Sequence, residues 1–211
     1  FHVEGLEELE YLTFFFPGVL LMVVLFTTVF ATMAVIEDRQ HGFLQQLAVA
    51  PTSRLSMVLG KTAGVTTVAA VQLALCLLAA PLAGFQLMEI HWPGLLVAAL
   101  LGCVSLTGIS FTMAWMVQST HAYHALMSMV LLPLWMVSGA MFPPGDGLLG
   151  GLMSANPMTY MVDGLRHGLH GGVAPVAQVG LWTALGVLAV SSVLSLGLAV
   201  VAASRSNRWR P

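Results

Sequence analysis

Long runs of apolar residues, separated by short polar stretches, dominate the sequence. The uncharged runs 12–36 and 62–88 are each longer than the ~20 residues that a helix needs to cross the hydrocarbon core of a bilayer. The uncharged stretch 90–145 is too long for one helix, and polar residues at 118–124 divide it. The pattern predicts an all-α membrane protein whose five transmembrane helices cover 12–36, 62–88, 93–117, 125–142 and 176–203.

Composition agrees with this interpretation. Hydrophobic residues make up 58% of the chain and charged residues only 8%, with a mean hydropathy of +0.90, whereas a soluble domain has ~25% charged residues. The net charge of -2 gives no basis for a nucleic-acid partner. The lipid bilayer is therefore the expected surrounding of the chain.

The basic residues predict the orientation, because Lys and Arg near the ends of spans are retained on the cytoplasmic side. Six of the seven Lys and Arg residues lie in the stretch 37–61 or in the C-terminal tail, and only Arg166 falls on the other side. We therefore expect the stretch 37–61 and the C-terminus to be cytoplasmic and the N-terminus to be external.

An external N-terminus requires a way across the membrane. The sequence starts at Phe1 and not at Met, and no signal peptide precedes the first predicted span. We expect an upstream span, so that 1–211 is a single transmembrane domain lacking its first span and the intact protein has six.

The cytoplasmic stretch 37–61 forms an elbow between two spans. It is polar at both ends, while Phe43, Leu44 and Leu47 have helical spacing and predict a short amphipathic helix. Pro51 ends this helix, because the residue before a proline is disfavoured in the helical region. The alternative is an ordinary polar loop.

The external stretch 143–175 is too long for a tight turn. Two groups of apolar residues at helical spacing predict two short helices, split at Asn156 and Pro157, that dip back into the outer leaflet. Asp163 and Arg166 are three residues apart and can pair on one helix face. The alternative is an exposed surface loop.

Candidate chemistry elsewhere favours packing over catalysis. His121 and His124, like His167 and His170, have the spacing of zinc ligands, but no third ligand accompanies either pair and the two pairs fall on opposite faces. We therefore expect no metal site. Ser110 lies in a span as the serine of an intramembrane protease does, but no histidine lies at its depth to act as a base, so we expect no catalytic residue.

The predicted spans contain no charged residue near their midpoints, which argues against an ion-coupled carrier. Their polar residues are uncharged Ser, Thr and Gln side chains. Four of them are candidates for a translocation surface, with helix packing as the alternative: Thr27, Thr28, Thr32 and Gln72.

Several stretches together resemble the type-2 ATP-binding cassette (ABC) exporter permeases, the membrane-spanning subunits of drug and polysaccharide exporters. These are Gly42 to Leu44 with Leu47, Ala50 to Arg54, Gly60 with Lys61, Leu132 to Pro144, and Asn156 to Arg166. The resemblance extends from about Leu12 to Arg205 and does not name a cargo.

The resemblance implies a transport subunit with no ATPase and no bound cofactor of its own. ATP and Mg would belong to a separate nucleotide-binding subunit, and a second permease subunit would complete a homo- or heterodimer in the bacterial plasma (inner) membrane. Consistently, Gly60, Lys61 and Thr62 lack the upstream glycine of a phosphate-binding loop. The implied ATPase-coupling residues are Glu37, Arg39, Gly42, Phe43, Leu44, Leu47, Pro51, Arg54 and Lys61.

By our hypothesis the external segment closes the outer end of the pathway and yields when cargo leaves. The residues assigned to this external gate are Asn156, Pro157, Tyr160, Asp163 and Arg166. The expected cargo is hydrophobic, amphipathic or lipid-linked. The alternatives are an ion-coupled or passive membrane carrier and, third, an intramembrane hydrolase.

Overall fold

The computed structural model describes residues 8–41, 54–143 and 147–205. Within these ranges it is built of helices and turns, and five helical stretches are long and apolar enough to cross a membrane. The expectation of an all-α membrane protein with five transmembrane helices is confirmed. These helices are α1 (Glu8–Gln40), α3 (Arg54–Leu77), α4 (Trp92–Met116), α5 (Thr120–Trp135, continued by η2) and α8 (Leu181–Arg205).

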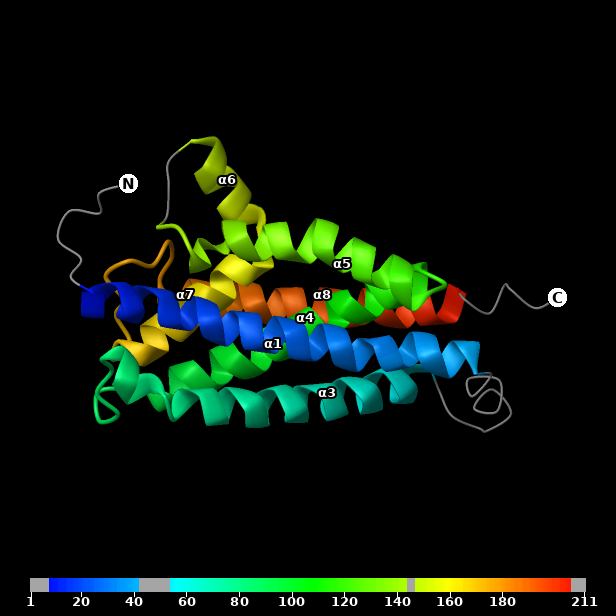
Figure 1. The fold of residues 1–211 in the computed structure, drawn as a ribbon, viewed down its shortest axis with the longest axis horizontal. Coiled ribbons are helices and arrows are strands. Elements are labelled where there is room, and N and C mark those ends of the chain that lie inside the picture. Colours follow the sequence, from blue (N-terminus) through cyan, green and yellow to red (C-terminus); the bar gives the residue numbers. More distant parts are fainter. Residues whose placement is uncertain (1–7, 42–53, 144–146, 206–211) are drawn as a thin grey trace.

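The long helices run side by side along the longest axis of the molecule (Figure 1). Four shorter elements connect them: the 3₁₀ helix η1 (Ala80–Ala83), the π-helical turn η2 (Met136–Ala140), and the helices α6 (Leu148–Ala155) and α7 (Pro157–Leu169). Helices α6 and α7 lie at the end of the bundle where α1 begins, and α8 finishes at the opposite end (Figure 1).

Helix α4 is the centre of the bundle and packs against α8, α7, α1 and α3. Small residues let α8 approach it closely, as is common where helices associate in lipid. The hydroxyls of Ser105 and Ser191 lie 2.6 Å apart across this contact, and Ser192 donates a hydrogen bond of 2.8 Å to the carbonyl of Leu101. The α4–α8 interface is therefore held by close packing and by hydroxyl groups.

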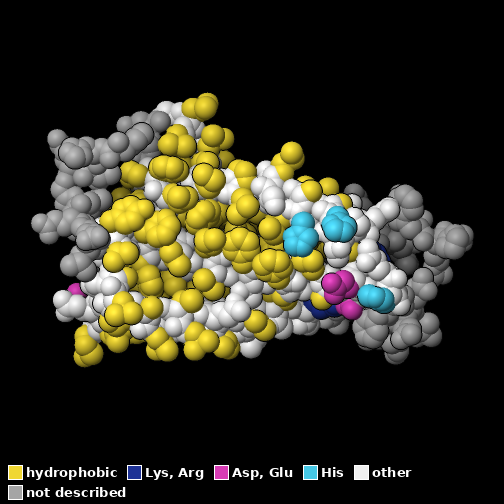
Figure 2. Space-filling model, viewed as in Figure 1, with side chains coloured by type: hydrophobic (Ala, Val, Ile, Leu, Met, Phe, Trp, Pro, Cys, Tyr) yellow, Lys and Arg dark blue, Asp and Glu magenta, His cyan; other side chains and the backbone are white. Residues whose placement is uncertain are grey.

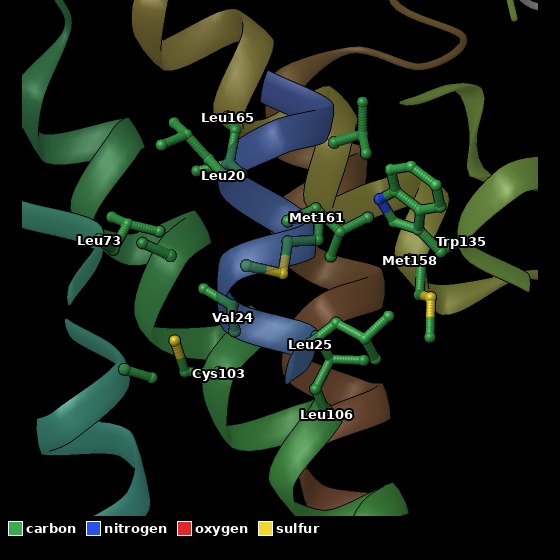
Figure 3. Packing of buried hydrophobic residues seen from close by; sticks show 14 of the residues in the cluster. Leu20, Val24, Leu25, Leu73, Cys103, Leu106, Trp135, Met158, Met161 and Leu165 are labelled. Carbon is green, nitrogen blue, oxygen red and sulfur yellow. The ribbon is translucent and has the colours of Figure 1, made fainter. Parts of the chain in front are cut away.

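The apolar core takes most of its side chains from α1, α3, α4, α5 and α7. Helix α7 contributes Met158, Met161 and Leu165, all 1% exposed or less, so this predicted short helix is part of the core. This excludes the alternative of an exposed surface loop for α7. Figure 3 shows these three residues packed with Leu20, Val24, Leu25, Leu73, Cys103, Leu106 and Trp135.

The outer surface is apolar as well. Figure 2 shows hydrophobic side chains over most of one face of the molecule, with histidine and most of the charged side chains gathered toward the end where α8 finishes. This distribution fits helices that contact lipid along most of their length and water at one end.

The helix that forms the second predicted span begins and ends at other residues than the prediction gave. Helix α3 begins at Arg54, so Lys61, the last residue of the predicted elbow, lies inside this helix. The helix stops at Leu77 and not at residue 88, because the chain turns through η1, where Pro81 lacks an amide donor and Gly84 has a φ of +91°. Residues 78–88 are largely apolar, so hydropathy alone predicted that the span continues through them.

The fourth and fifth spans also start at other residues than predicted. Helix α5 begins at Thr120 and not at residue 125, because the Ser119 side chain accepts a hydrogen bond from the amide of Ala122 and caps the helix. Helix α8 begins at Leu181 and not at residue 176, since the preceding residues are bound to α7, as described below.

Glycine 168 allows α7 to contact the backbone of α4, and we expect Gly168→Ala to lower the free energy of unfolding by about 1–3 kcal/mol. A Cβ at this position would lie 2.7 Å from Leu95 Cα, where backbone cannot yield. Gly151→Ala in α6 is the matched control, because nothing lies within 4 Å of its added Cβ and the expected change is a gain of about 1 kcal/mol or less. Thermal unfolding in detergent measures both, and equal midpoints would contradict the close α4–α7 contact.

Candidate functional site

The last turn of α1 forms the beginning of the predicted coupling elbow 37–61 and is bonded to other helices. Asp38 forms an ion pair with Lys61 of α3, and both side chains are a little over one-quarter exposed. Arg39 donates a hydrogen bond through Nη2 to the carbonyl of Val117 at the end of α4. Its guanidinium also lies over the ring of Trp115, with Cζ 5.8 Å from the ring centroid. Two consecutive residues thus join α1 to α3 and to α4.

Gln40 adds a third connection. Its Nε2 donates a 3.1 Å hydrogen bond to the carbonyl of Gln118 in the turn between α4 and α5. The α1 helix ends immediately afterwards, where the amide of His41 donates to the carbonyl of Glu37 at 2.9 Å. The end of α1 is therefore bonded to α3, to the end of α4 and to the α4–α5 turn at the same time.

At the opposite end of the bundle, Asn156 separates α6 from α7. Its Oδ1 accepts a 3.0 Å hydrogen bond from the amide of Met158, which caps α7, and Pro157 occupies the first position of the helix. Its Nδ2 donates to the carbonyl of Leu134 in α5 at 2.6 Å. The helix break expected at Asn156 and Pro157 is confirmed, and the same side chain ties the break to α5.

Tyr160 connects the two short helices. Its hydroxyl donates a 2.6 Å hydrogen bond to the carbonyl of Ser154 near the end of α6. The tyrosine is half-buried, whereas Ser154 is exposed. The angle between α6 and α7 is therefore restrained by this bond as well as by Asn156.

Asp163 is buried in the bundle, with 1% of its surface exposed. Its Oδ2 accepts hydrogen bonds from the amides of Gln178 and Val179, both at 3.1 Å, in the segment that precedes α8. Its Oδ1 lies 3.9 Å from Nη1 of Arg166, so the expected pair is observed. Burial raises the pKa of Asp163, against the opposing effects of the Val179 amide, Arg166 and the Gln178 amide.

Arg166 is 2% exposed and reaches three other parts of the chain. Its Nη2 donates to the carbonyl of Gly139 in η2 at 2.6 Å, and its Nη1 to the carbonyl of Val176 at 3.3 Å. The guanidinium lies 4.5 Å from the ring centroid of Phe14 in α1. Burial lowers the pKa of Arg166 to about 10, with Asp163 opposing the shift, so the side chain is charged near neutral pH.

The chain matches the family described as ABC-2 family transporter protein over residues 4–201. It belongs to the ABC-2 transporter family. A relative named as a transport permease, ycf38, of Cyanophora paradoxa is 27% identical over 172 residues, which cover 79% of this chain and 58% of the relative. The chain thus corresponds to a little over half the length of that relative.

In this ABC-2 protein the predicted coupling residues are only partly described. Glu37 is exposed at the end of α1, and Arg39 and Lys61 contact neighbouring helices of the same chain. Gly42, Phe43, Leu44, Leu47 and Pro51 lie outside the described residues, as does the side chain of Arg54.

Of the four candidates for a translocation surface in the ABC-2 protein, two are buried in α1 and the other two join α1 to α3. Thr28 and Thr32 are fully buried and bond carbonyls of their own helix, at Leu25 (2.9 Å) and Thr28 (2.5 Å) respectively. The hydroxyl of Thr27 donates to Oε1 of Gln72, which links α1 to α3.

The sequence pattern favoured His167 as an interfacial histidine over a zinc ligand, and it did not predict the hydrogen bonds that this side chain makes. The imidazole is 6% exposed and bonded at both nitrogens: Nδ1 to the amide of Ala174 at 2.9 Å and Nε2 to the carbonyl of Val179 at 2.8 Å. Among the described residues, no group of three His, Cys, Asp or Glu side chains is placed to hold a metal ion. The missed signal was the spacing of Asp163, Arg166 and His167, which puts all three on neighbouring faces of α7.

Proposed function

We propose that the chain is the membrane permease of an ABC exporter, which moves a hydrophobic, amphipathic or lipid-linked cargo out of the cytoplasm with ATP hydrolysed by a separate subunit. Membership of the ABC-2 family over 4–201 supports the permease assignment. The observation that carries the coupling mechanism is the bonding of the last turn of α1 to three other parts of the bundle through Asp38, Arg39 and Gln40.

The proposed coupling starts at the cytoplasmic elbow 37–61. Phe43, Leu44 and Leu47 would enter a groove of the ATPase subunit, which binds ATP and Mg, while Glu37 and Arg54 lie at the flanks. A displacement of the elbow moves the end of α1. Because the turn of α1 at 38–40 is bonded to α3, α4 and the α4–α5 turn, these helices would shift as a body.

The proposed outer gate is formed by α6 and α7. Asn156 ties the gate to α5, Tyr160 ties α7 to α6, and Arg166 ties α7 to η2 and to α1. These bonds hold α7 in the core, which closes the outer end. Movement of α5 relative to α1 would break them and let cargo leave.

The proposed assembly contains two permease subunits and a nucleotide-binding ATPase in the bacterial plasma membrane, with the C-terminus in the cytoplasm. The helices expose apolar side chains along their length, and this surface can contact both lipid and a second subunit. ATP-dependent transport by purified permease and ATPase in proteoliposomes tests the proposal. Cargo movement with no nucleotide hydrolysis in the preparation would support a passive or ion-coupled carrier instead.

We expect Asn156→Ala to reduce export by about fivefold or more while leaving the bound ATPase unchanged. The variant loses the cap of α7, which is worth about 1–2 kcal/mol, and the bond to the Leu134 carbonyl, so the closed gate is misplaced. Transport and co-purification of the ATPase are measured in parallel. Ser154→Ala is the control, because within the described part of the chain the Ser154 hydroxyl bonds the nearby Gly151 carbonyl of α6 and no other helix. Normal export by Asn156→Ala would dismiss this part of the gate.

A further inference from the structure

The segment between α7 and α8 is held by one side of α7. We name residues 174–179 the strap. Asp163 accepts hydrogen bonds from two of its amides, Arg166 donates to its Val176 carbonyl, and His167 bonds it at both ends, through the Ala174 amide and the Val179 carbonyl. The strap in turn leads into α8, the main packing partner of the central helix α4. Three polar side chains of one helix thus determine where α8 starts.

The two partners of His167 define its protonation state. A backbone amide only donates, so Nδ1, which lies 2.9 Å from the Ala174 nitrogen, must accept and carries no proton. A carbonyl only accepts, so Nε2, at 2.8 Å from the Val179 oxygen, carries the proton and donates. The strap is therefore bound by a neutral imidazole in a single tautomer.

Protonation of Nδ1 is incompatible with this arrangement. It would set an N–H group against the N–H of Ala174 and convert a 2.9 Å hydrogen bond into a repulsive contact. The partly buried Ala174 amide would also lose its partner, which costs free energy to the extent that water does not replace it. His167 therefore binds a proton more tightly when the strap is released than when the strap is bound. By linkage, protonation shifts the equilibrium toward the released strap.

Charged groups of both signs surround His167, and the first turn of α1, which packs against α7, contains Glu8 and Glu10. Asp163 and Arg166 precede it on α7, and the first attracts an imidazolium whereas the second repels it. His170 follows at the end of α7 with its ring against Phe85, and Glu89 and His91 precede α4. Helices α4 and α6, turn η2 and all of α8 before Arg205 contain no Asp, Glu, Lys, Arg or His. The attraction of Asp163 and the repulsion of Arg166 oppose each other, whereas the hydrogen bond from the Ala174 amide is lost outright on protonation.

We propose that His167 is a positioning residue that latches the strap while neutral and releases it when protonated, so that acidification of the external side loosens the connection between α7, which is part of the proposed outer gate, and the start of α8. Only the assignment of α7 to a gate rests on the proposed function. The latch itself is a property of the purified chain and requires neither ATPase nor cargo. Histidine is suited to this task because its charge changes between about pH 5 and 8.

Hydrogen exchange of strap amides, corrected for the intrinsic pH dependence of exchange, tests the latch in the purified full chain in nanodiscs. In the wild type, exchange of peptides covering 174–179 is expected to be about tenfold faster at acidic than at neutral pH, while a peptide from α4 keeps its protection. In His167→Gln, which has a neutral donor and acceptor, this pH response is expected to vanish. His91→Gln and His170→Gln are matched controls and are expected to keep it.

Two results would overturn the proposal: a wild-type strap whose protection is independent of pH, or a pH response that survives in His167→Gln. If glutamine fails to hold the strap at any pH, the wild type and the two control variants decide, with a response in all three supporting the latch and its absence rejecting it. Transport is measured separately. A working latch without ATP-driven export would contradict the proposed function alone, and export with a pH-independent strap would contradict the latch alone.

Discussion

Arg166→Met is expected to abolish export and to lower the free energy of unfolding by about 3–5 kcal/mol. The substitution removes a guanidinium that is 2% exposed and leaves the carbonyls of Gly139 and Val176 without their donors. It also leaves the Asp163 carboxylate buried without a counter-charge. Chemical unfolding in detergent measures the stability, and proteoliposome transport measures the export.

The double variant Asp163→Asn with Arg166→Met is the control for this explanation. It removes both charges, and the asparagine Oδ1 can still accept from the strap amides, so a substantial part of the lost stability is expected to return. Export is not expected to return, because the bond from α7 to η2 remains absent. A single variant as stable as the wild type would show that the pair does not hold α7 in place.

The stability of Arg166→Met is also expected to depend on pH. Burial already raises the pKa of Asp163, and loss of Arg166 removes one of the effects that lower it. The folded variant then binds a proton more tightly than the unfolded chain, so its stability is greatest at low pH and falls as the pH rises from the unfolded pKa of about 3.9 toward the raised folded value. An unfolding series over this range measures the slope, and a rising stability would contradict the assignment.

Leu47→Asp is expected to weaken binding of the ATPase subunit by about a hundredfold or more. If Leu47 enters a groove of that subunit, a carboxylate there loses its hydration without a partner, and ~3 kcal/mol corresponds to this factor. Co-purification of tagged permease with the ATPase measures the interaction. Membrane insertion and helix content are expected to be normal, because the substitution lies in the elbow.

Met88→Asp is the matched control for the elbow. Met88 is 97% exposed in the turn between η1 and α4, away from the elbow, so the same change of charge is not expected to affect ATPase binding. Retained binding by Leu47→Asp would remove the elbow from the coupling mechanism, and equal loss by both variants would point to a general effect of added charge.

Local patterns predicted two features of the segment that forms α6 and α7. An Asn-Pro sequence between two apolar groups predicted the break between α6 and α7, since the asparagine caps a helix and the proline starts one. The spacing of Asp163 and Arg166 predicted their pairing. These signals act within a few residues along the chain, so no knowledge of the remaining fold was needed.

The ends of the helices were predicted less accurately, because hydropathy does not detect an apolar turn. Hydropathy distinguishes apolar from polar residues, but the turns through η1 and at 136–140 are themselves apolar. Backbone geometry ends the helices there: Gly84 and Gly139 adopt φ values of +91° and +80°. Such positions are decided by how the chain must turn to pack on its neighbours.

By itself the sequence determined five apolar helices, the gathering of basic residues at one end and the break at Asn156, because helix periodicity, the thickness of the bilayer and capping act locally. Only the tertiary structure decided that α7 is buried, that Arg39 reaches Val117, and that Arg166 reaches Gly139. These contacts join residues 78 and 27 positions apart, and the pattern along one helix carries no information about which distant carbonyl will face it. Packing of the helices against one another supplies those partners.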